Sequence, residues 1–143
     1  MFKVQITILA VLCAATFTLA APIGKVSHDT TVSIKASSSD DDAFHGRGTW
    51  FSDDSGSCDI GFGQDDMIVA MNKAQMGDLQ GPDSQCGKMI RVHYGGKSVD
   101  LKVVDTCPSQ YCDEGALDLS QAAFKKLAGG LSKGVLPLKW EFI

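Results

Sequence analysis

The sequence predicts a small all-β domain with one short helix, stapled by disulfides. From Gly46 onward, short apolar runs are separated by glycine-rich turns, a pattern typical of small β-barrels and sandwiches. Only one long helical pattern is present, which argues against alternating strands and helices. Once an N-terminal leader is set aside, four cysteines remain, and an even number in a short exported chain indicates a disulfide framework.

The expected strands are short, and one pair forms a clear hairpin. Residues 90–94 alternate apolar and polar side chains, Gly95-Gly96 supplies a turn with positive φ, and residues 99–103 alternate again. The full set of expected strands is Gly48–Ser52, Met67–Asn72, Lys88–Tyr94, Ser98–Asp105, Ala116–Leu119 and Pro137–Ile143.

One helix is expected over Gln121–Ala128. Ser120 can cap its N-terminus, and Gly129-Gly130 can end it. A shorter helical turn is expected at Lys73–Met76.

The first 21 residues read as a cleaved signal peptide. Lys3 precedes an uncharged run from Val4 to Ala21, and this run ends in small residues before Pro22. A retained membrane anchor is the alternative, but polar residues dilute the run. We therefore expect a secreted, extracellular protein with no membrane contact after cleavage. Residues 22–45 are polar and read as a flexible extension, and residues 46–143 form the domain.

Charge and cysteine spacing narrow the partners. The formal net charge is −4, so we expect no nucleic-acid partner. No C-x2-C pair occurs and the three histidines lack ligand spacing, so we expect no metal and no cofactor. Two disulfides are expected among Cys58, Cys86, Cys107 and Cys112, and three pairings are open. We expect a monomer.

Three segments together resemble one family. They are GRGTWF at 46–51, VVDTCP at 103–108 and GALDLSQAAFKKL at 115–127, supported by IVAMNKAQMG and the final LKWEFI. They resemble the double-psi β-barrel of expansins, rare lipoprotein A-like proteins and barwin, and most of all the small single-domain fungal loosenins. The resemblance implies a six-stranded barrel, with Cys58 paired to Cys86 and Cys107 to Cys112.

The resemblance also implies a groove with acidic residues. Asp118 matches the essential acid of the family, Asp105 lies in the same groove, and Thr49 lines the groove beside the acid. Two neighbouring carboxylates would separate their pKa values and leave one able to donate a proton. Each aspartate also has a structural alternative: Asp118 as a helix cap and Asp105 as a turn residue.

Asp53 is a third candidate. It follows Thr49 by four residues, the spacing at which family 45 endoglucanases carry their catalytic base. The surrounding family 45 motif is absent, and Asp53-Asp54-Ser55-Gly56 also reads as an exposed turn.

Aromatic side chains in these segments are candidates for stacking on sugars. Trp50, Phe51 and Tyr111 lie in or beside them, and Trp50 and Tyr111 are taken as the substrate-binding candidates with Thr49. Trp140 alternates with charged residues and is expected in the core. The expansin pattern has an aromatic two residues after its first groove aspartate, where this chain has Cys107, so Tyr111 would have to replace it.

The leading hypothesis is therefore an expansin-like protein that binds cell-wall polysaccharide such as cellulose or chitin and loosens it without net hydrolysis. The first alternative is an inverting glycoside hydrolase or lytic transglycosylase with Asp118 as the acid. The second is a cysteine-proteinase inhibitor or another secreted protein-binding module. A barrel alone does not decide among these functions.

Overall fold

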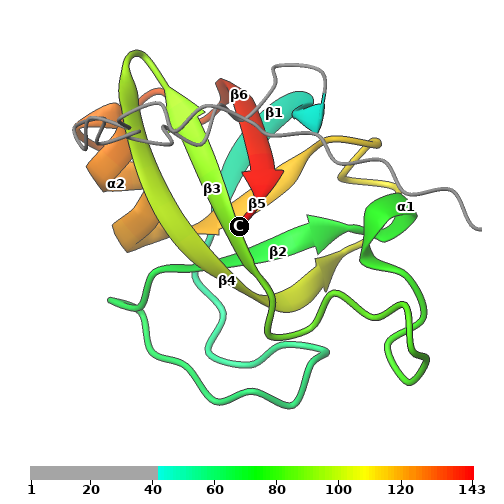
Figure 1. Cartoon of the computed structure of the whole chain (residues 1–143). Coiled ribbons are helices and arrows are strands. Elements are labelled where there is room, and N and C mark those ends of the chain that lie inside the picture. Colours follow the sequence, from blue (N-terminus) through cyan, green and yellow to red (C-terminus); the bar gives the residue numbers. More distant parts are fainter. Residues whose placement is uncertain (1–41) are drawn as a thin grey trace, which may run out of the picture. The chain divides into compact units, whose positions relative to one another are not determined.

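The computed structural model describes residues 42–143, so the expected signal peptide and nearly all of the expected extension lie outside the described residues. Six strands close into a barrel in the order β1-β5-β2-β4-β3-β6 (Figure 1). Within residues 42–143, neither helix is long and apolar enough to span a membrane. The elements are β1 (Phe44–Phe51), β2 (Ile68–Asn72), α1 (Lys73–Met76), β3 (Met89–Tyr94), β4 (Lys97–Cys107), β5 (Leu117–Ser120), α2 (Gln121–Ala128) and β6 (Leu136–Phe142).

The six-stranded barrel is confirmed, and the strand ends differ from the predicted ends where tertiary pairing decides them. β1 begins at Phe44, two residues before the expected start of the domain, because Phe44 pairs with Trp140 of β6 and stacks on its ring at 4.4 Å. β4 continues to Cys107 because its last residues pair with β2. α1 occupies Lys73–Met76, where the sequence predicts a short helical turn, so the barrel carries this turn beside the one helix of the predicted fold class.

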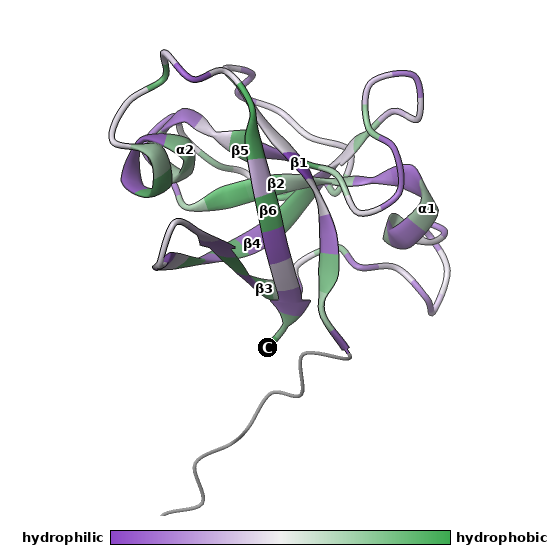
Figure 2. Ribbon diagram, turned by 90° about the horizontal axis from the view of Figure 1, so that it is seen from above, coloured by the Kyte–Doolittle hydropathy of each residue, from purple (hydrophilic) through white to green (hydrophobic). Residues whose placement is uncertain are grey.

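The core is built from alternate residues of the strands. In β6, Leu136, Leu138 and Trp140 are buried while their neighbours face outward, and the colour bands along β6 in Figure 2 follow this alternation. Trp140 is fully buried, as predicted, and its indole N–H donates to the carbonyl of Gly115 at 2.9 Å. The buried polar end of this large side chain is thereby satisfied.

Two glycines allow β1 to pass close to the segment before β5. A Cβ on Gly46 would lie 2.2 Å from the carbonyl oxygen of Gly115, and a Cβ on Gly115 would lie 2.1 Å from that of His45. Gly115 also has a φ of 81°, a backbone conformation that residues with a side chain rarely adopt. The crossing therefore fixes where β5 starts relative to β1, and it lies directly beneath the indole of Trp140.

Both disulfides implied by the resemblance are present. Cys58 bonds to Cys86 and Cys107 bonds to Cys112. The first joins the long loop after β1 to the loop before β3, and the second closes a short loop after β4. The two bridges therefore restrain the loops near the end of β4 that carries Asp105.

Candidate functional site

Four strands bring Thr49, Asp118 and Asp105 into one row on the outside of the barrel. Thr49 of β1 is opposite Asp118 of β5, Asp118 is opposite Ala70 of β2, and Ala70 is opposite Asp105 of β4. Residues opposite one another on neighbouring strands point to the same face of a sheet. The row therefore places the three predicted site residues side by side.

A β-bulge decides that Asp105 belongs to this row. Val69 pairs with Val103, but the next residue of β2, Ala70, pairs with Asp105, so Val104 is skipped. Val103 and Val104 are both buried, and Asp105 then points outward. In a regular pairing of the same residues, Asp105 would share the inward face of Val103, because a bulge resets which face the following side chains occupy.

A depression of about 370 Å³ lies over this row. The small side chain of Ala70 separates the two aspartates and leaves room between them. The lining residues come from β1, β2, β4, β5 and two loops, and they are Phe51, Asp53, Ala70, Asp105, Thr106, Cys107, Pro108, Tyr111 and Asp118. We call this depression the acidic groove.

Asp118 is the most perturbed of the groove residues. Its Oδ1 accepts a hydrogen bond of 2.6 Å from the hydroxyl of Thr49. Burial raises the pKa of Asp118 above its usual range, and the charges of Asp53 and Asp105 raise it further, against the Thr49 hydrogen bond and the charge of Arg47. Asp118 therefore stays protonated to a higher pH than an exposed aspartate, as a proton donor or a neutral hydrogen-bond partner requires.

This shift predicts how Asp118→Asn changes stability. A carboxyl whose pKa is raised by folding stabilises the folded state only while it is protonated, and this contribution is lost as the pH rises through the folded pKa. Asparagine does not ionise and can still accept the Thr49 hydrogen bond. We expect the midpoint of thermal unfolding of Asp118→Asn to rise relative to the parent between pH 3 and pH 7.

Asp65→Asn, which alters an exposed carboxylate outside the groove lining, is the matched control. Its unfolding midpoint relative to the parent should be the same at pH 3 and pH 7. An Asp118→Asn protein whose stability relative to the parent is the same at both pH values would contradict the shift.

Asp105 is held in place by the loop after β1. Its Oδ1 accepts a hydrogen bond of 2.8 Å from the backbone N–H of Ser57. The loop can approach this closely because of Gly56, where a Cβ would lie 2.5 Å from the carbonyl oxygen of Val104. Asp53 belongs to the same loop and lines the groove, so the structure brings Asp53, Asp105 and Asp118 together.

The structure places the aromatic candidates in different environments. Tyr111 lines the groove and is 66% exposed. Trp50 differs from the expectation: it is opposite Leu119, faces inward and packs against the core. Phe51 lines the groove instead, because it shares the strand face of Thr49. The two-residue period of β1, counted from Thr49, is the sequence signal that could have assigned Phe51.

Within residues 42–143, no three or more histidine, cysteine, aspartate or glutamate side chains are arranged to hold a metal ion.

A closed barrel with two parallel strand pairs and an acidic outer groove defines a double-psi β-barrel protein. The chain belongs to the double-psi β-barrel family described as lytic transglycolase, whose model matches residues 43–140.

The chain is also similar to individual proteins. It is 33% identical to the solved Streptomyces papain inhibitor, with a TM-score of 0.62, over 71% of this chain and 94% of that one. A curated papain inhibitor of Streptomyces mobaraensis is 45% identical over 58 residues, which are 40% of this chain and only 38% of that relative. A point mutant of the Clavibacter michiganensis expansin, solved with cellohexaose, is 26% identical with a TM-score of 0.60, over 71% of this chain and 50% of that one.

Proposed function

We propose that this protein is a secreted, expansin-like protein that binds a cell-wall polysaccharide in the acidic groove and loosens the polymer without net hydrolysis. The observation that carries the proposal is the Thr49–Asp118 hydrogen bond, whose acceptor Asp118 lines the acidic groove. A neutral carboxyl beside a hydroxyl can exchange hydrogen bonds with the hydroxyl groups of a sugar chain.

Aromatic side chains at the groove support a glycan ligand. Phe51 and the exposed Tyr111 line the groove, and aromatic faces supply apolar area for sugar rings. The similar expansin of Clavibacter michiganensis was solved with cellohexaose, an oligosaccharide. These two observations favour a polysaccharide over other ligands.

The placement of the carboxylates supports a non-lytic action. An inverting hydrolase needs its acid and base about 6.5–9.5 Å apart with a water between them. The backbones of Asp118 and Asp105 are separated by β2, which at about 4.8 Å per strand is roughly 9.6 Å, and side chains on the outside of a barrel diverge. Asp105 is also hydrogen-bonded to Ser57, and Asp53 lies in an exposed loop outside the strands, which favours structural roles for both over that of a positioned base.

The proposal includes a cleaved signal peptide at residues 1–21, followed by a polar extension at residues 22–45. The two disulfides in the barrel fit export to an oxidising compartment.

The decisive experiment combines two readouts on the purified mature protein: extension of cellulose or chitin sheets under constant load, and release of soluble reducing ends. We expect the parent to weaken the sheets without releasing reducing ends, and Asp118→Asn to weaken them at least about tenfold less, because the hydrogen-bonding acid is lost. Asp65→Asn should match the parent.

Release of reducing ends that depends on Asp118 would instead make the protein a hydrolase or transglycosylase. Sheet weakening by Asp118→Asn equal to that of the parent would remove the acidic groove from the mechanism.

Inhibition of a papain-like protease is the second candidate function. The 33% identity to a papain inhibitor over nearly all of that chain favours it. The loop closed by Cys107 and Cys112 also exposes Tyr111, while the guanidinium of Arg47 donates a hydrogen bond to the Tyr111 carbonyl. A rigid loop with an exposed aromatic can insert into a cleft at low entropic cost. Loss of papain inhibition in Tyr111→Ser, with inhibition kept in Asp118→Asn, would support this function.

A further inference from the structure

The charges of the barrel are divided between two sets of segments. Residues 88–102 and 119–143 carry eight lysine or arginine residues and two acidic residues, whereas the rest of residues 42–143 carries two basic and twelve acidic residues. The basic segments form β3, most of β4, α2 and β6. A chain of negative net charge therefore contains a region of opposite sign.

A second row of side chains crosses this region on the outside of the barrel. His45 of β1 is opposite Lys139 of β6, Lys139 is opposite His93 of β3, and His93 is opposite Ser98 of β4. Val92 beside His93 and Leu138 beside Lys139 are buried, so His93 and Lys139 face outward. His45 and Ser98 are themselves exposed.

A depression of about 420 Å³ lies over this row, larger than the acidic groove. Besides the row, Lys97 and the turn glycines Gly95 and Gly96 line it, and both glycines have open space where a Cβ would lie. A flat chain can therefore approach the backbone there. We call His45, His93, Lys97 and Lys139 the basic face.

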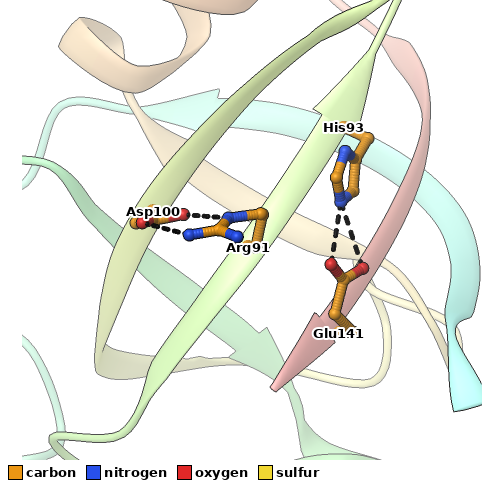
Figure 3. A network of polar contacts seen from close by, with 4 residues as sticks. All are labelled: Arg91, His93, Asp100 and Glu141. Carbon is orange, nitrogen blue, oxygen red and sulfur yellow. Dashed lines mark hydrogen bonds and ion pairs between the residues drawn. The ribbon is translucent and has the colours of Figure 1, made fainter. Parts of the chain in front are cut away.

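The two acids of the region are already engaged by other bases. Figure 3 shows Asp100 held by Arg91, at 2.6 and 2.8 Å, and Glu141 against Nε2 of His93, at 2.9 and 3.1 Å. Within residues 42–143, Lys97 pairs with no carboxylate. Lys133 lies beside the depression, where its Nζ donates to the hydroxyl of Tyr94 at 2.8 Å. The positive charge of Lys97 is therefore available to a ligand at this depression.

The basic face and the acidic groove lie on opposite sides of the barrel. In the closed order β1-β5-β2-β4-β3-β6, the groove is centred on β5 and β2, and the basic face is centred on β3 and β6. A negatively charged ligand is repelled by Asp53 and Asp105 and attracted to the other side.

We propose that the basic face is a second binding site, for a carboxylated glycan. The choice of a glycan rests on the proposed function, whereas the choice of an anion rests on the charges alone. The carboxylate class fits because a few lysines suit a ligand of moderate charge density, and the net charge of −4 opposes a polyanion as dense as a nucleic acid. A protein with both sites joins a neutral polymer to an acidic one.

The test measures retention of the mature protein by polygalacturonate gels, with insoluble cellulose and chitin in parallel. We expect Lys97→Gln/Lys139→Gln to lose about tenfold in affinity for polygalacturonate and to keep the parent's binding to the neutral polymer. His93→Gln should lose affinity in the same direction, and Lys73→Gln, an exposed lysine on α1, should match the parent. Raising the salt from about 50 to 200 mM should weaken the parent's retention on polygalacturonate about tenfold.

Affinity for polygalacturonate that survives both charge removal and high salt would overturn the basic face as a site. Equal affinity for an RNA homopolymer would overturn the assignment to a carboxylated glycan. Retention on polygalacturonate by a protein that binds no neutral polymer would support the basic face and count against the proposed function, so the two proposals fail separately.

Discussion

Gly46→Ala is expected to destabilise the barrel by about 3 kcal/mol or more, and at the upper end of that range to prevent folding. The new methyl group would lie 2.2 Å from the carbonyl oxygen of Gly115 and 2.6 Å from the backbone N of Ala116. Both are backbone atoms, and the first also accepts the hydrogen bond of the buried Trp140 indole, so neither can move away alone. Urea unfolding followed by Trp fluorescence measures the loss.

Gly130→Ala is the matched control, because open space surrounds the position of its Cβ. We expect its unfolding free energy to stay within about 0.5 kcal/mol of the parent, as for most surface substitutions. A Gly46→Ala protein as stable as Gly130→Ala would show that the crossing of β1 over residue 115 is not as tight as described.

Removing the Cys58–Cys86 bridge is expected to cost about 3.5 kcal/mol of stability, against about 2 kcal/mol for the Cys107–Cys112 bridge. The bridges close loops with sequence separations of 28 and 5 residues, and the longer loop restricts the unfolded chain more. Urea unfolding curves of Cys58→Ala/Cys86→Ala, Cys107→Ala/Cys112→Ala and the parent, each fitted with its own m-value because loss of a cross-link expands the unfolded chain, give the two losses.

The same pair of variants tests whether the loop after β1 contributes to activity as well as to stability. This loop carries Ser57, whose backbone N–H holds Asp105. We expect Cys58→Ala/Cys86→Ala to weaken cellulose or chitin sheets less than the parent does, even at temperatures where the barrel is fully folded. A larger loss of stability from opening the five-residue loop would contradict the entropic account.

Elements encoded by local signals were predictable from the sequence. The β3–β4 hairpin follows from two alternating runs around Gly95-Gly96, and α2 occupies the predicted Gln121–Ala128 because its Ser120 cap and Gly129 stop are local. The start of β1 was not predictable in this way, because Phe44 joins the strand through its contact with Trp140, almost one hundred residues away.

The site shows the same division. Thr49, Asp105 and Asp118 were predicted from the family resemblance, and the structure places them in one row. The face of Asp105 depends on a bulge that leaves no mark in the sequence, and Trp50 was assigned to the groove when Phe51 occupies that face. Alternation along β1 alone decides between Trp50 and Phe51. The face of Asp105 is decided only by how β4 pairs with β2.

The bulge at Val104 makes the face of Asp105 a property of strand pairing. If β4 paired regularly with β2 beyond Val103, Val104 would lie opposite Ala70 and face outward, and Asp105 would take the inward face of Val103. Loss of the bulge would thus carry a carboxylate toward the core and a valine toward the groove with no change of sequence. The acidic groove therefore depends on how β2 and β4 pair as much as on the aspartates themselves.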